Sequence, residues 1–99
     1  MEETLKLGGN IELTGFNQLD RGMMVILKKI VGNYARRISD KCKNFEKLNL
    51  TMKRVGTDQY EIHAKVMDNG TAITSEITER NIFVGVDNCL KKITNQQDK

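Results

Sequence analysis

The chain has 99 residues, of which 38% are hydrophobic and 29% are charged, and it contains no proline and no tryptophan. This composition is too apolar for an intrinsically disordered chain and too charged for a membrane protein, and the length predicts one domain. No apolar run approaches the roughly 18 residues of a spanning helix, and the start Met-Glu-Glu-Thr lacks the basic head of a signal peptide. Two cysteines do not make a disulfide scaffold, so we predict a cytoplasmic protein with no membrane partner.

The first half of the chain predicts one strand and one long helix. Residues 1–9 end in Gly8-Gly9 and are predicted to form a flexible lead-in. Residues 11–14 alternate apolar and polar side chains, which predicts a short strand. Asp20 is a good N-cap, and from residue 21 to about residue 43 the apolar period becomes 3.6, which predicts an amphipathic helix. The apolar stripe of this helix comprises Met23, Leu27, Ile30, Val31, Tyr34, Ile38 and Cys42.

The second half predicts three strands and a final helix. Residues 48–53, 60–66 and 73–78 alternate apolar and polar side chains, and Asn69-Gly70 between the last two segments is a strong hairpin signal. Three such strands form an antiparallel meander. Asn81 is the predicted cap of the final helix, after which residues 96–99 are predicted to fray. The apolar face of this helix comprises Ile82, Phe83, Val86, Leu90 and Ile93.

The order β-α-β-β-β-α predicts an α+β fold in which each element has one apolar face to bury. A two-layer sandwich satisfies this requirement, with a four-stranded sheet and both helices on one face. The layout is similar to that of double-stranded-RNA-binding domains. The single domain is predicted to span residues 10–95.

Sixteen Lys and Arg against thirteen Asp and Glu leave a net charge of only +3, so the distribution of charge matters more than its sum. On the first helix, a group of cations falls within an arc of about 100° opposite the apolar stripe. Gly32 lies in the middle of this arc, where it would let a phosphate approach the backbone, and Asp40 lies just outside. The helix cations are Arg21, Lys28, Lys29, Arg36 and Lys43.

The final helix adds Lys91 and Lys92, with Arg80 at its start. If the two helices lie side by side, these eight cations form one basic surface suited to nucleic-acid phosphates. The alternative is a solvated helix face, because amphipathic helices commonly carry Lys on their wet side and near their C-termini. The aromatic-rich strand of an RNA recognition motif and the Gly-x-x-Gly loop of a KH domain are absent, so we expect recognition by charge and shape.

No motif for catalysis or cofactor binding is present in the sequence. It lacks a Gly-x-x-x-x-Gly-Lys phosphate loop, a Gly-x-Gly-x-x-Gly motif and a Cys-x-x-Cys pair. His63 is predicted to be a surface histidine, and Cys42 and Cys89 are predicted to be small buried side chains. We therefore predict that the protein is not an enzyme and takes no cofactor, metal or small-molecule substrate.

Two segments resemble the ribosome hibernation-promoting factors. Residues 13–17, Leu-Thr-Gly-Phe-Asn, are similar to the Ile-Thr-Gly-x-Asn that ends the first strand of that family. Residues 81–87, Asn-Ile-Phe-Val-Gly-Val-Asp, with Lys92-Ile93 after them, resemble the Asp-Met-Tyr-Ala-Ala-Ile-Asp and Lys-Leu of its last helix. The resemblance spans residues 11–96 and implies the short, single-domain form, which is expected to be a monomer.

The resemblance implies binding to rRNA of the small ribosomal subunit through the basic helical face, in the groove used by messenger and transfer RNA, with inhibition of translation. Lys29, Arg36 and Lys92 match basic positions of the family. Two alternatives stay open: a free-standing binder of structured RNA, and a protein-interaction module that uses the sheet face or a strand edge. The positions where the family has Arg or Lys and this chain does not are Met24, Ile30, Asn33 and Asn95.

Overall fold

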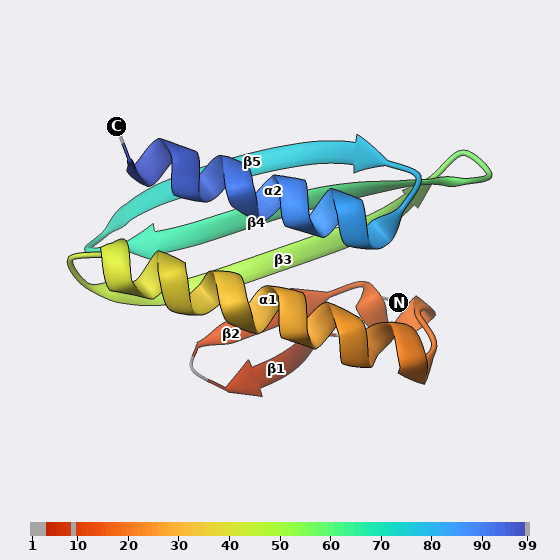
Figure 1. The fold of residues 1–99 in the computed structure, drawn as a ribbon, viewed down its shortest axis with the longest axis horizontal. Coiled ribbons are helices and arrows are strands. Elements are labelled where there is room, and N and C mark those ends of the chain that lie inside the picture. Colours follow the sequence, from red (N-terminus) through yellow and green to blue (C-terminus); the bar gives the residue numbers. More distant parts are fainter. Residues whose placement is uncertain (1–3, 9, 99) are drawn as a thin grey trace.

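Two helices lie side by side on one face of a five-stranded sheet in the computed structural model, which describes residues 4–8 and 10–98 (Figure 1). The strands are β1 (Thr4–Gly8), β2 (Ile11–Thr14), β3 (Phe45–Val55), β4 (Gln59–Asp68) and β5 (Thr71–Glu79). The helices are α1 (Arg21–Lys41) and α2 (Ile82–Gln97), and a short 3-10 helix spans Phe16–Gln18. The predicted α+β class with two helices is confirmed.

The strands follow the chain order β1-β2-β3-β4-β5 across a mixed sheet. β2 and β3 are parallel and are connected by α1, whereas every other neighbouring pair is antiparallel. The predicted meander is confirmed, and its second turn contains Asn69 and Gly70 at φ 51° and 84°. Both residues tolerate positive φ, which a tight hairpin needs to match the twist of its strands.

The prediction of four strands was wrong, because residues 4–8 of the expected lead-in form an additional strand. β1 pairs antiparallel with β2, with Leu5 opposite Leu13. Gly8 and Asn10 have φ of 85° and 66°, and such positive values suit a reversal of the chain after β1. In the sequence, Leu5 and Leu7 alternate with polar neighbours, and this pattern could have predicted the strand. Residues 1–3 and 9 lie outside the described part of the chain.

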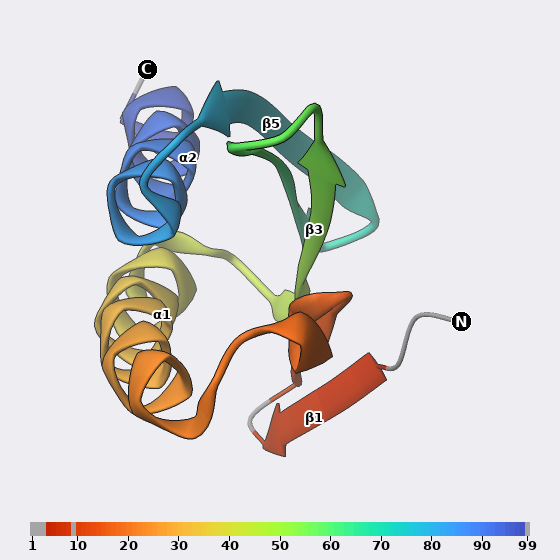
Figure 2. The ribbon, with the colours of Figure 1, turned by 90° about the vertical axis from the view of Figure 1, so that its right-hand side faces the viewer.

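The core lies between the sheet and the two helices (Figure 2). Leu13, Leu50 and Ala64 occupy adjacent positions on β2, β3 and β4 and turn buried side chains toward the helices. The predicted caps are confirmed, since Asp20 accepts a hydrogen bond from the Met23 amide and Asn81 caps α2. The fully buried helix residues are Leu27, Val31, Ile38, Val86, Cys89, Leu90 and Ile93.

The end of α2 is longer than the sequence indicated. Gln96 and Gln97 were expected in a frayed tail, but both belong to α2. The Gln97 side-chain amide donates to the Ile38 carbonyl over 3.2 Å, and Lys41 Nζ lies 2.6 Å from the Asp98 carboxylate. These contacts with α1 hold the last turn in place. Lys99 lies outside the described residues.

Candidate nucleic-acid interface

The seam between the two helices combines cations of α1 with acids of α2. Both helices run in the same direction, as Figure 1 shows. Burial, and then the neighbouring Asp87 carboxylate, raise the pKa of Tyr34 above its usual 10.0. The Arg37 guanidinium lies 5.5 Å from the centre of the Tyr34 ring, and Lys41 pairs with Asp98. Lys41 is therefore paired with an acid of α2, and Arg37 lies over the ring of Tyr34, which is itself next to Asp87.

Lys29, Arg36 and Lys91 lie on the side of the helical layer that is turned away from the sheet, and all three are exposed. Lys29 and Arg36 are separated by seven residues, or roughly two turns and about 10 Å, so they project in nearly the same direction. Lys91 lies opposite the buried Val86 and Ile93 around α2. We call these three residues the outer cations.

Two of the outer cations, Arg36 on α1 and Lys91 on α2, lie at a similar level. Tyr34 is beside Asp87 and Lys41 is beside Asp98, which places Arg36 near the level of Lys91 along the parallel axes. Packed helices are typically about 8–10 Å apart, so the two side chains can reach one phosphate group or two neighbouring ones. The structure thus brings together three of the eight residues that the sequence indicated.

Arg21 and Lys28 occupy a different side of α1. Lys28 lies about 180° around the helix from Arg37, and therefore faces away from α2. Both Arg21 and Lys28 line a groove between α1 and β1. Gly32 also borders the groove, and a side chain at this exposed position would meet no atom within 4 Å. The backbone of α1 is thus open to close approach there.

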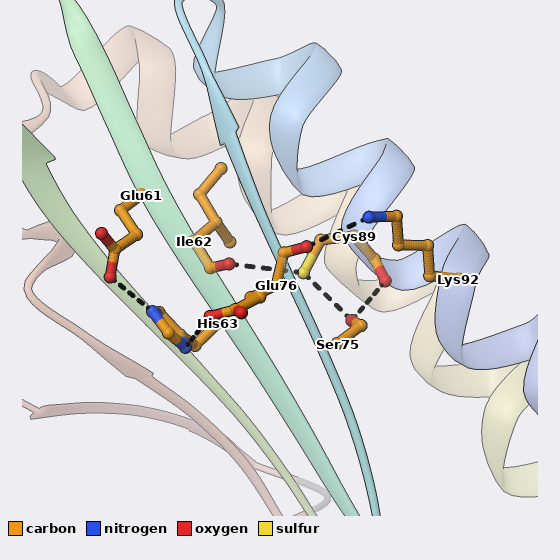
Figure 3. A network of polar contacts seen from close by, with 7 residues as sticks. All are labelled: Glu61, Ile62, His63, Ser75, Glu76, Cys89 and Lys92. Carbon is orange, nitrogen blue, oxygen red and sulfur yellow. Dashed lines mark hydrogen bonds and ion pairs between the residues drawn. The ribbon is translucent and has the colours of Figure 1, made fainter.

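Lys43, Arg80 and Lys92 are separated from the outer cations. Lys43 follows the end of α1 in the connection to β3. Arg80 Nε lies 3.5 Å from a carboxylate oxygen of Asp58 in the β3–β4 turn. Lys92 lies on the side of α2 that faces β5, where its ammonium donates to the Glu76 carbonyl over 3.1 Å (Figure 3). The eight cations therefore occupy several neighbouring surfaces.

None of the outer cations has a carboxylate within 4.0 Å among residues 4–8 and 10–98, where the ion pairs join other side chains. Asp40 follows Arg36 by one turn of α1 and Asp87 precedes Lys91 by one turn of α2, which places an acid next to each of these two cations. An exposed cation without an ion-pair partner keeps its full charge for an incoming anion.

The opposite face of the sheet carries a histidine between two carboxylates (Figure 3). His63 Nε2 lies 2.6 Å from Glu61 and Nδ1 lies 3.5 Å from Glu76, on the neighbouring strand. The three side chains are partly open to solvent, so such contacts contribute less than about 1 kcal/mol. In the described part of the chain, no group of three or more His, Cys, Asp or Glu residues is arranged to hold a metal ion.

The cysteines differ in burial. Cys89 is fully buried, as predicted, and its thiol contacts the Ser75 hydroxyl at 3.2 Å and the Ile62 carbonyl at 3.7 Å. Burial raises the pKa of the Cys89 thiol, so it stays protonated at neutral pH. Cys42 is only half-buried, because it follows the last turn of α1.

No protein-family model and no curated protein matches this sequence. Within the described residues, neither helix combines the length and the apolar character that crossing a lipid bilayer requires.

Proposed function

We propose that the protein binds structured RNA through the outer face of its helical layer, and that its target is rRNA of the small ribosomal subunit. The observation that carries the proposal is the arrangement of Lys29, Arg36 and Lys91 on one side of two parallel helices. Arg36 and Lys91 lie at a similar level and Lys29 lies about 10 Å along α1 from Arg36, a spacing that fits a row of phosphates, and their binding would release condensed counterions.

Recognition by charge and shape is favoured over base stacking. The five aromatic side chains are buried or half-buried, and Tyr34 and Phe16 are only 8% and 1% exposed. A stacking platform for single-stranded bases needs exposed aromatic faces. A duplex or a folded RNA presents phosphates at fixed positions without needing such faces, which suits a rigid helical layer.

Two further observations support the ribosome as the target. The order β2-α1-β3-β4-β5-α2 is the element order that the resemblance to hibernation-promoting factors implies. Lys29 and Arg36, two positions that match basic residues of that family, are outer cations. In this proposal the bound protein occupies rRNA and hinders translation.

Charge reversal tests the proposal. The triple variant Lys29→Glu, Arg36→Glu, Lys91→Glu is compared with Lys65→Glu, which changes an exposed lysine of β4 on the opposite face. Each phosphate contact contributes about 0.9 to the slope of log affinity against log salt, so the triple variant loses roughly 2.7 from this slope. A slope of roughly 2.7 corresponds to a ~40-fold change in affinity between ~50 and ~200 mM salt. At ~50 mM salt, the triple variant is expected to bind more than ~40-fold more weakly than the original protein.

The assay is co-sedimentation with purified small ribosomal subunits as the salt concentration rises. The original protein migrates with the subunits at low salt and is released at high salt, and Lys65→Glu behaves alike. Competition with a generic RNA duplex then separates binding to the ribosome from binding to any structured RNA, since only a ribosome-binding protein prefers the subunits. Migration of the original protein at the top of the gradient at low salt would refute the ribosomal target. An unchanged salt slope in the triple variant would refute the site.

A further inference from the structure

The two edge strands of the sheet differ in their contacts with the rest of the chain. At the β5 edge, the side chains of α2 bind strand carbonyls: Lys92 donates to Glu76 over 3.1 Å and Gln96 donates to Thr74 over 2.8 Å. At the other edge, β1 pairs on one side only, with β2, among residues 4–8 and 10–98. Alternate residues of β1 thus turn backbone N–H and C=O groups outward, as an edge strand does.

The helical layer does not extend over β1. Neighbouring helices are about 8–10 Å apart and strands about 4.8 Å apart, so two helices cover roughly four strands. In Figure 1, β1 emerges past the side of α1 that is turned away from α2, and its Leu5 is 41% exposed while Leu7 is half-buried. The fifth strand therefore leaves part of its apolar face uncovered.

Between this strand and α1 lie two adjoining cavities of about 370 and 410 Å³ that share Leu5 and Lys28. We call them together the β1–α1 groove. Apolar side chains make up half of its lining residues, and Arg21 and Lys28 stand on its α1 wall. Among the described residues that line it there is no carboxylate. The apolar lining residues are Leu5, Leu7, Ile11, Phe16, Leu19 and Met24.

We infer that this edge binds an extended, acidic segment of a partner protein, which adds to β1 as a sixth strand. Main-chain hydrogen bonds to β1 provide the affinity, and alternate apolar side chains of the segment enter the β1–α1 groove. Acidic side chains on the same face of the segment reach Arg21 and Lys28 on the α1 wall of the groove. The occupant that fits the open strand edge, the apolar pockets and the cations together is thus an extended, acidic peptide segment.

Other occupants fit these features less well. An RNA strand offers no repeating backbone N–H and C=O groups, and the aromatic ring of Phe16 is too buried to stack on a base. A second copy pairing through β1 would offer its own residues 4–8, which hold no acid to pair with Arg21 and Lys28. An acidic peptide avoids both problems.

The probe is a fluorescent peptide of about eight residues, blocked at both ends, in which Leu and Glu alternate on one face of the strand and Thr occupies every position of the other face. Two isomers carry N-methyl groups on alternate amides, either on the Leu and Glu residues or on the Thr residues. Only one set of amides faces β1, so one isomer loses at least about tenfold in affinity, and the other binds like the parent peptide. Equal effects of the two methylation patterns would refute strand addition.

Surface variants locate the binding site. Leu5→Lys and Lys28→Glu each weaken peptide binding by at least about tenfold, and a peptide with Lys in place of each Glu binds Lys28→Glu better than it binds the original protein. The matched control is Val84→Lys on α2, which changes an apolar side chain of similar exposure (45%) and leaves binding unchanged. Circular dichroism confirms that each variant is folded, and backbone amide shifts report where the peptide binds.

Several results would overturn the inference. These are equal peptide affinity for Leu5→Lys and the original protein, amide shifts outside β1 and α1, tighter binding of an oligouridylate at the same amides, or dimerisation that Leu5→Lys abolishes. The test is independent of RNA binding, because the triple variant of the outer cations keeps the groove and is expected to bind the peptide normally. Failure of one proposal therefore leaves the other standing.

Discussion

The same substitution, glycine to alanine, is expected to have opposite effects in the two helices. Gly32 lies in the middle of α1, is exposed, and has no atom within 4 Å of an added Cβ. Alanine removes the entropic penalty of glycine there, so Gly32→Ala should raise the free energy of unfolding by about 1 kcal/mol.

Gly85 lies in α2 where the helix packs closely on the sheet. An added Cβ would lie 2.5 Å from Ile62 Cδ1 and 3.2 Å from Glu79 Cβ. Ile62 is fully buried and cannot move into solvent, so overpacking costs roughly 1–3 kcal/mol. After the gain of about 1 kcal/mol in helix propensity, Gly85→Ala should lower the free energy of unfolding by about 1 kcal/mol.

Thermal and urea unfolding followed by circular dichroism measure both variants. For a chain of this size, about 1 kcal/mol shifts the Tm by roughly 4–8 °C, upward for Gly32→Ala and downward for Gly85→Ala. A Gly85→Ala variant as stable as Gly32→Ala would refute the close packing of α2 on Ile62. A loss of stability in Gly32→Ala would show that the glycine is constrained by a contact or a non-helical backbone.

Three further outcomes are expected. Asn81→Ala removes the side-chain oxygen that accepts two backbone amides at the start of α2, and should cost about 1 kcal/mol in urea unfolding. A hydrogen bond from Lys47 is the main cause that lowers the pKa of Glu12 below its usual 4.5. The ionised Glu12 therefore stabilises the fold fully above about pH 4.5, and this contribution is lost as the pH falls through the folded-state pKa. Lys47→Gln should flatten the dependence of the unfolding free energy on pH in this range. Burial raises the pKa of the Cys89 thiol and also keeps reagents away from it. A thiol reagent should therefore modify half-buried Cys42 first and Cys89 only as fast as the protein opens locally, and mass spectrometry distinguishes the two sites.

Local chemistry determined most elements of this protein. Asp20 and Asn81 cap the two helices because their side chains accept the free amides of the first turn, and this signal lies within three residues. Asn69-Gly70 fixes the last hairpin through positive φ, again a local property. The buried stripe of α1 follows from a 3.6-residue period that the sequence displays directly.

Only the tertiary structure decided where the helix cations point and what β1 does. Rotation of each helix on the sheet places Lys91 outward and Lys92 against β5, although the two residues are adjacent in sequence. It also places Arg37 and Lys41 in the seam, where acids of α2 lie. A five-residue strand such as β1 is stable only when a neighbouring strand supplies its hydrogen bonds, so its existence depends on β2 and the sheet behind it.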